Sequence, residues 1–101
     1  MNREVYRYTF DDSIPMDDVE SSLLLAILSV ESLHGESQAH LDVRHLMDTE
    51  QRACVIDGST QAGSDLNRLF VGYLRREFGT EVFQVKHMTE PGKREMAGAA
   101  A

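Results

Sequence analysis

The chain has 101 residues, of which 17 are acidic and 10 are basic, and its formal net charge at pH 7 is −7. This length suits a single domain with one hydrophobic core and no metal or disulfide to hold it. The negative charge opposes non-specific attraction to phosphate backbones and anionic lipid surfaces, so nucleic acid is disfavoured as a partner. The longest apolar run, residues 23–28, is too short to span a membrane.

A strand followed by a helix is predicted for the first third of the chain. Residues 4–10 carry the β-branched and aromatic side chains typical of a strand, and turn-forming residues follow at 11–15. A helix is predicted over residues 16–35, because apolar side chains recur there at helical spacing and the final glycine suits a helix end. Three further residues widen its apolar face beyond one stripe, which indicates either deep burial or a second contact. They are Leu24, Leu25 and Leu28.

The middle of the chain is expected to form two strands and a second helix. Residues 37–47 alternate between apolar and polar side chains, and this period of two predicts a half-buried strand. A short hairpin connection at 48–51 leads into another predicted strand, residues 52–57. After a loop at 58–60, a second helix with one clean apolar stripe is expected to end before Gly79. The stripe consists of Leu66, Leu69, Phe70, Tyr73, Leu74 and Phe78.

The order of these elements predicts the fold class. Residues 82–88 form the last predicted strand, and residues 89–101 lack apolar periodicity and predict a disordered tail. The domain, residues 1–88, therefore reads βαββαβ. This order predicts an α+β fold, a ferredoxin-like split βαβ sandwich with a four-stranded antiparallel sheet of order 4-1-3-2 and two helices on one face. In this interpretation, strands one and three are central and parallel, so their carboxyl ends meet at one edge.

That edge would gather carboxylates and hydroxyls, the ligands that Mg²⁺ or Ca²⁺ requires. The weak metal candidates are Asp11, Asp12 and Asp57. The same residue types are preferred in turns and helix caps, and the spacing fits no EF-hand loop, so we predict no bound metal or cofactor. Residues 58–63 precede a helix in the manner of a phosphate cradle, but they match no phosphate-binding motif, and an ordinary loop is favoured.

Strand alternation also predicts an open sheet face with a basic character. The residues directed inward would be Leu41, Val43, Val55, Phe83 and Val85. Four basic residues then collect on the open face, and we hypothesise that they bind an anionic ligand or partner. They are Arg7, Arg44, Arg52 and Lys86.

Two alternatives stay open for this face. An antiparallel sheet often has an ordinary solvated face with cross-strand ion pairs, such as one between Asp42 and Arg7. In the strand at residues 52–57, Cys54 and Ile56 could equally face inward, and a shift of one residue flips the whole strand.

The sequence limits function to broad classes. Cys54 is the only cysteine and is expected to be a buried thiol in a reducing compartment, and the first residues lack the features of a signal peptide, so we predict a cytoplasmic protein. No nucleophile–base pair or metal-ligand motif is recognisable, which favours a non-enzymatic interaction or regulatory module that self-associates as a homodimer or binds a protein partner. The alternative is a small-molecule sensor or enzyme with a site at the strand–helix loop edge or at a subunit interface.

Overall fold

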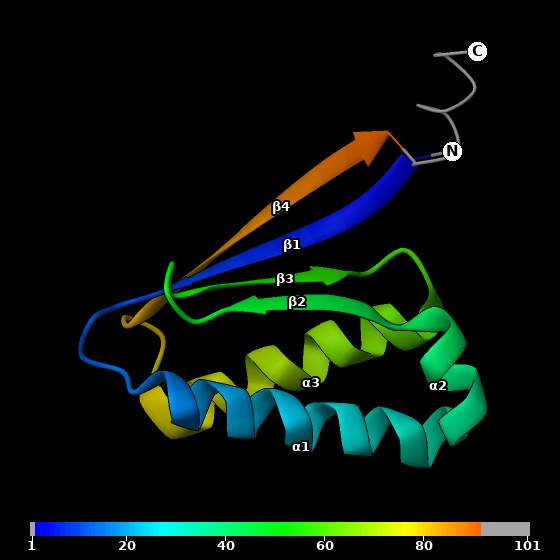
Figure 1. Cartoon of the computed structure of the whole chain (residues 1–101), viewed down its shortest axis with the longest axis horizontal. Helices are drawn as coiled ribbons and strands as arrows, with labels where there is room; N and C mark the ends of the chain where they lie inside the picture. Colours follow the sequence, from blue (N-terminus) through cyan, green and yellow to red (C-terminus); the bar gives the residue numbers. More distant parts are fainter. Residues whose placement is uncertain (1, 92–101) are drawn as a thin grey trace.

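The computed structural model describes residues 2–91 and has an α+β architecture, in which helices cover one face of a four-stranded antiparallel open sheet (Figure 1). The strands are β1 (Asn2–Phe10), β2 (Arg44–Asp48), β3 (Ala53–Asp57) and β4 (Phe83–Pro91). The helices are α1 (Met16–His34), α2 (Glu36–Asp42) and α3 (Gln61–Phe78). The sheet order is β2-β3-β1-β4, so β2 and β4 are its edges.

The two central strands run antiparallel, and the prediction that they are parallel was wrong. Val5 of β1 lies opposite Asp57 of β3, and Thr9 lies opposite Ala53. Each helical crossover returns the chain in the direction of the strand it left, but the tight turn between β2 and β3 reverses that direction. The carboxyl ends of β1 and β3 therefore lie at opposite ends of the sheet.

Residues 36–42 form the helix α2 where a strand was predicted, and β2 begins only at Arg44. This segment contains good helix formers and no β-branched residue. The Gln38 side-chain amide donates to the Asp42 carboxylate at 2.7 Å, an (i, i+4) pair that supports a helix. The alternation of apolar residues led to a wrong prediction of a strand. Ala39 is buried and Val43 packs against the core, and these two residues are one helical turn apart.

The other element ends follow local signals in the sequence. Gly35 and Gly79 follow α1 and α3 with φ angles of 87° and 84°, the left-handed region that favours glycine. The Thr60 hydroxyl caps α3 by accepting the Gly63 N–H at 3.0 Å. β4 extends three residues beyond its predicted end, and the remainder of the predicted tail, residues 92–101, lies outside the described residues.

The faces of β3 are opposite to those favoured from sequence. Cys54 lies opposite Tyr8, and Ile56 lies opposite Tyr6, so all four side chains are on the helix side. Cys54 and Ile56 belong to the buried core, whereas Val55 is on the open face. The register of β3 against β1 decides which side chains of β3 face the helices, because β3 has apolar residues on both faces.

The core lies between the sheet and the helices and is centred on α3. Phe70 is fully buried and packs its ring against Tyr8, with ring centroids 4.9 Å apart. The buried Tyr8 hydroxyl donates to the side-chain oxygen of Asn67, which satisfies its polar group. Of four further apolar residues on α1 and α3, two are buried and two are half-buried against the core. The buried pair is Leu23 and Leu74, and the half-buried pair is Ile27 and Leu69.

Candidate functional site

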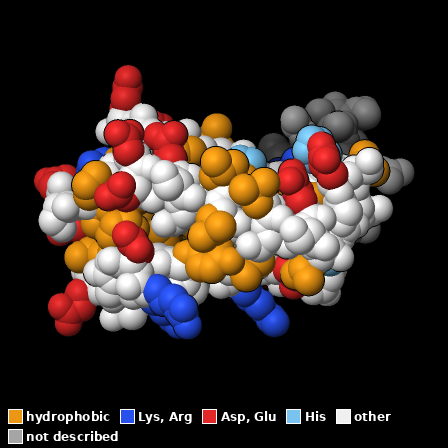
Figure 2. All heavy atoms as spheres, turned by 90° about the horizontal axis from the view of Figure 1, so that it is seen from below, with side chains coloured by type: hydrophobic (Ala, Val, Ile, Leu, Met, Phe, Trp, Pro, Cys, Tyr) orange, Lys and Arg blue, Asp and Glu red, His pale blue; other side chains and the backbone are white. Residues whose placement is uncertain are grey.

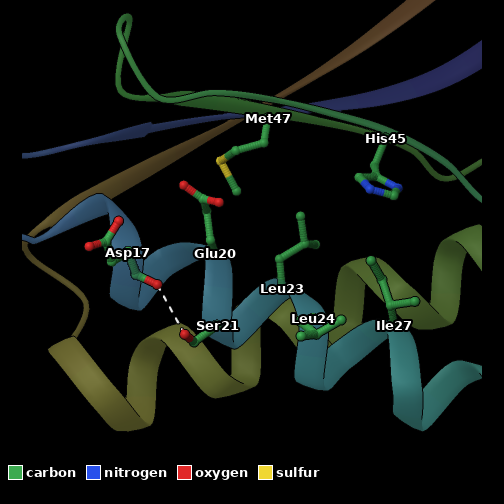
Figure 3. A pocket seen from close by; sticks show the side chains of 8 residues that line it. All are labelled: Asp17, Glu20, Ser21, Leu23, Leu24, Ile27, His45 and Met47. Atoms are coloured by element: carbon green, nitrogen blue, oxygen red, sulfur yellow. Dashed lines mark hydrogen bonds between the residues drawn. The ribbon is translucent and has the colours of Figure 1, made fainter.

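A groove runs between α1 and the edge strand β2 (Figure 3). His45 and Met47 point from β2 toward the helix, and Leu23, Leu24 and Ile27 line the groove from α1. This section has a volume of about 460 Å³. A second section of about 270 Å³ shares His45 and Ile27 with the first and continues toward α2. Together the two sections follow the inner side of β2 along its length.

Polar groups surround this apolar groove. Asp17 and Glu20 line its first section, and Glu31 lies in the second, 3.4 Å from the imidazole of His40. Partial burial of the imidazole in the groove lowers the pKa of His45, so its neutral form is favoured near neutral pH. The groove therefore combines an apolar lining with acidic ends.

The outer edge of β2 has no strand neighbour among residues 2–91. β2 pairs with β3 alone, so its outward N–H and C=O groups are available to another strand. It contains neither lysine nor proline, two residues that commonly protect edge strands. Its central residue, Leu46, is 66 % exposed. This edge can therefore accept an additional strand.

The exposed apolar surface of α1 lies next to the same edge. Leu24, Leu25 and Leu28 are 57 %, 52 % and 51 % exposed. Hydrophobic side chains gather over the middle of the helix layer when it is seen from its outer side (Figure 2). Leu24 lines the groove, and Leu28, one turn further, lies on the same side of α1, whereas Leu25 lines a separate hollow between α1 and α3. The core thus leaves part of the apolar surface of α1 uncovered, so the deep burial that was one of the two predicted explanations does not apply to these leucines.

Three of the four predicted basic residues share the open face of the sheet. Arg7 lies opposite Lys86 across β1 and β4, and Arg44 lies on the same face of β2, opposite Asp57. Within the part of the chain that the structure describes, no carboxylate oxygen approaches their side-chain nitrogens within 4.0 Å. The predicted pair of Asp42 and Arg7 does not form, because Asp42 belongs to α2.

Arg52 is not part of this face. It precedes β3 in a turn with φ 53°, a conformation that is uncommon for a residue other than glycine. Its guanidinium donates to the backbone carbonyls of Phe10, Asp11 and Ile14 and lies 3.6 Å from the Asp12 carboxylate. Arg52 therefore ties the loop between β1 and α1 to the β2–β3 turn, which is a structural role.

The acidic cluster predicted at one sheet edge does not form. Asp11 and Asp12 follow β1, whereas Asp57 ends β3 at the opposite end of the sheet, because these strands are antiparallel. The Ser13 hydroxyl donates to Asp11 at 2.7 Å and lowers the pKa of this carboxyl. No group of three or more potential metal ligands occurs within residues 2–91.

The loop at residues 58–63 uses its N–H groups internally. Gly58 donates to the Glu4 carbonyl at 2.7 Å, and the backbone N–H of Ser59 donates to the Asp57 carboxylate at 2.9 Å. The N–H of Gly63 is taken by the Thr60 hydroxyl. The loop is therefore a helix cap that packs on β1, and these three groups are not free to hold a phosphate.

Cys54 is 1 % exposed, and burial raises the pKa of its thiol to about 12. Because the thiolate is the reactive form, we expect the native protein to resist iodoacetamide at pH 8 and to be alkylated only in denaturant. Mass spectrometry of native and unfolded samples measures this difference. Rapid single labelling of the native protein would contradict the assignment of Cys54 to the core.

Two residues of the open face were missed from sequence, Leu46 and Val55. They lie opposite one another on β2 and β3. The available signal was the (i, i+2) placement of Leu46 between Arg44 and Asp48, which puts these three side chains on one face. The predicted strand started too early for this pattern to be considered by itself.

None of the helices within residues 2–91 combines the length and the apolar content needed to cross a membrane. Comparison with protein-family models, characterised proteins and solved structures finds no significant match. The groove, the β2 edge and the open face are therefore the features of this chain that bear on its function.

Proposed function

We propose that this protein is a non-enzymatic interaction module that forms a symmetric homodimer through the β2 edge. The observation that carries the proposal is the self-complementary sequence of that edge, Arg44-His45-Leu46-Met47-Asp48. Antiparallel pairing about a two-fold axis at Leu46 places Arg44 opposite Asp48 of the partner subunit, and Asp48 opposite Arg44 of the partner subunit. The two Leu46 side chains lie side by side at the axis, on the open face of the sheet.

The same pairing covers the exposed apolar surface of α1. Because α1 borders the groove beside β2, a sheet that continues across the two-fold axis brings the α1 helices of both subunits together. Neighbouring strands lie about 4.8 Å apart and packed helices about 8–10 Å apart. The sheet and the helix layer can therefore both continue across the axis of the dimer. Leu24 and Leu28 then lie between the helices. A single dimer interface thus covers both the unpaired edge of β2 and the exposed leucines of α1.

The other sheet edge is less suited to this role. β4 contains Lys86 and ends at Pro91, and lysine and proline both disfavour pairing along an edge. Residues 86–90 of β4 also place opposite charges about an apolar residue, Met88, so the lysine and the proline, and not the charge pattern, distinguish the two edges. The β2 edge is therefore the proposed interface.

A charge exchange tests the dimer. For the wild type we expect sedimentation at micromolar concentration to show a species of twice 11.4 kDa. Arg44→Asp or Asp48→Arg alone places like charges opposite each other across the axis, and each is expected to yield monomers. The double exchange restores opposite charges and is expected to restore the dimer. Arg76→Asp on α3 is the matched control, because it makes the same change of charge away from β2.

Cross-linking adds a measurement that does not depend on charge. Opposed residues in an antiparallel pair have Cα atoms about 4.5–5.5 Å apart, within the range that a disulfide spans. Leu46→Cys is expected to form a covalent dimer under mild oxidation, whereas Leu41→Cys, at a residue 68 % exposed on α2, is not. A folded wild type that stays monomeric throughout the micromolar range, or a folded double exchange that stays monomeric, would refute the proposal.

We also propose that the fold is a ferredoxin-like split βαβ sandwich with α2 added to the first crossover, and that the protein is cytoplasmic. The order β2-β3-β1-β4, which is 4-1-3-2 from the other edge, supports the first point. The single free thiol of Cys54 supports a reducing compartment.

A further inference from the structure

The open face of the sheet carries a transverse row with one side chain from each strand. The registers place Leu46 opposite Val55, Val55 opposite Arg7, and Arg7 opposite Lys86. The row is apolar over β2 and β3 and cationic over β1 and β4. Leu46, Arg7 and Lys86 are exposed, and Val55 is half-buried.

The two cations of the transverse row oppose each other without compensation. Arg7 and Lys86 are direct cross-strand neighbours, an arrangement that is destabilising when both side chains carry the same charge. No acidic side chain pairs with either of them within residues 3–89. Their neighbours along β1 and β4, Thr9 and Gln84, are neutral. A ligand that brings carboxylates to this place would relieve the repulsion.

Within residues 3–89, the acids of this face lie over its other half, and Glu90 of β4 is opposite Arg3, four residues along the strand from Lys86. Asp48 belongs to β2 and Asp57 to β3, and neither shares the transverse row. The half of the face over β1 and β4 is therefore locally positive, although the whole chain has a net charge of −7. The positive patch matches a short acidic ligand, whereas a nucleic acid extends beyond the patch and its phosphates meet the negative charge of the rest of the chain.

We propose that the transverse row docks an acidic amphipathic segment of a partner protein. The carboxylates of the segment bind Arg7 and Lys86, and its apolar side chains pack on Val55 and Leu46. The planar fork of arginine suits bidentate binding of a carboxylate, which fixes the segment in position. A pleated sheet face offers a broad contact to a segment with both kinds of side chain, whereas a small anion would stay largely hydrated there.

This site does not require the proposed dimer, because Arg7 and Lys86 lie on strands remote from the β2 edge. A monomeric protein that still binds the segment would refute the dimer and leave this site intact. A dimeric protein that does not bind the segment would refute this site and leave the dimer intact. Sedimentation and peptide titration therefore distinguish the two failures.

The test is a titration with a synthetic helical peptide of glutamate and leucine, followed by amide chemical shifts and fluorescence anisotropy. We expect shifts along the transverse row and a loss of affinity of about tenfold or more for the double variant Arg7→Gln/Lys86→Gln. Its melting temperature is expected to stay equal or to rise, because the variant removes a repulsion. A role in folding alone would move the melting temperature in the other direction.

Matched controls separate a docking site from general charge attraction. Arg68→Gln/Arg76→Gln changes the net charge equally but acts on α3, and it is expected to leave the affinity unchanged. A peptide with lysine in place of glutamate is expected to cause no shifts along the transverse row, and inorganic phosphate at the same charge concentration is expected to cause no saturable shift. Equal losses in both double variants, or shifts confined to the groove beside β2, would overturn the proposal.

Discussion

Replacing Phe70 with Ala is expected to lower the free energy of unfolding by about 3–5 kcal/mol. Phe70 is fully buried at the centre of the core, and its ring lies 4.9 Å from that of Tyr8 and 6.5 Å from that of Phe10, measured between centroids. Truncation removes these aromatic contacts and leaves a cavity that the surrounding helices and sheet can fill only in part. A loss of this size is a large fraction of the stability of a small domain.

Urea unfolding followed by circular dichroism measures this effect. Leu25→Ala is the comparison, because Leu25 is also an apolar helix residue but is 52 % exposed. We expect a change below about 1 kcal/mol for that variant. If Phe70→Ala cost as little as Leu25→Ala, the central position of α3 in the core would be wrong.

The second large effect is expected at Gly63, in the first turn of α3. A Cβ atom at this position would lie 2.2 Å from the backbone carbonyl oxygen of Asp57, a distance that neither rotamer changes nor small shifts can relieve. Gly63→Ala must therefore displace the backbone of the β3–α3 loop, including the Thr60 cap. We expect a loss of about 1–3 kcal/mol or more in unfolding free energy.

Gly72→Ala is the matched substitution in the same helix, with the opposite expected sign. No atom lies within 4 Å of a Cβ atom built at Gly72, and alanine favours the helix interior over glycine by about 1 kcal/mol. Thermal and urea unfolding of both variants give the two signs directly. A neutral Gly63→Ala would show that the close approach of α3 to β3 is misplaced, and a destabilised Gly72→Ala would show that the space beside Gly72 is not open.

The long helices and the central strand β1 could be predicted from sequence because their patterns have one solution. The stripe of α3 repeats over more than three turns and is followed by Gly79, and α1 is likewise followed by Gly35. β1 alternates aromatic with polar residues, which assigns Tyr6 and Tyr8 to the helix side without reference to other strands. Such long patterns outweigh errors at single positions.

The predictions that were wrong concern features that the sequence of a single segment does not determine. β3 has apolar residues on both faces, so only its register against β1 directs Cys54 and Ile56 inward. Residues 36–42 alternate like a strand, but the (i, i+4) pair of Gln38 and Asp42 and the packing of Ala39 and Val43 on the core favour the helix. The acidic cluster was predicted from a wrong strand direction, and Arg52 from a wrong strand start. Three of the four basic site residues were placed on the right face because alternation in β1, β2 and β4 was read correctly.

The pairing of β1 with β4 has a consequence for how this chain folds. β1 is a central strand, but one of its two partners is β4, and the Glu4–His87 contact between them joins residues 83 positions apart in the sequence. Closing so long a loop costs entropy before any contact compensates for it, and topologies rich in such contacts fold slowly. During synthesis, β1 emerges from the ribosome before β4, so the edge of β1 that pairs with β4 stays unpaired until β4 has emerged. Conditions that lengthen this interval are expected to favour aggregation through the unpaired edge of β1, at a stage before the β2 edge of the folded protein can contribute.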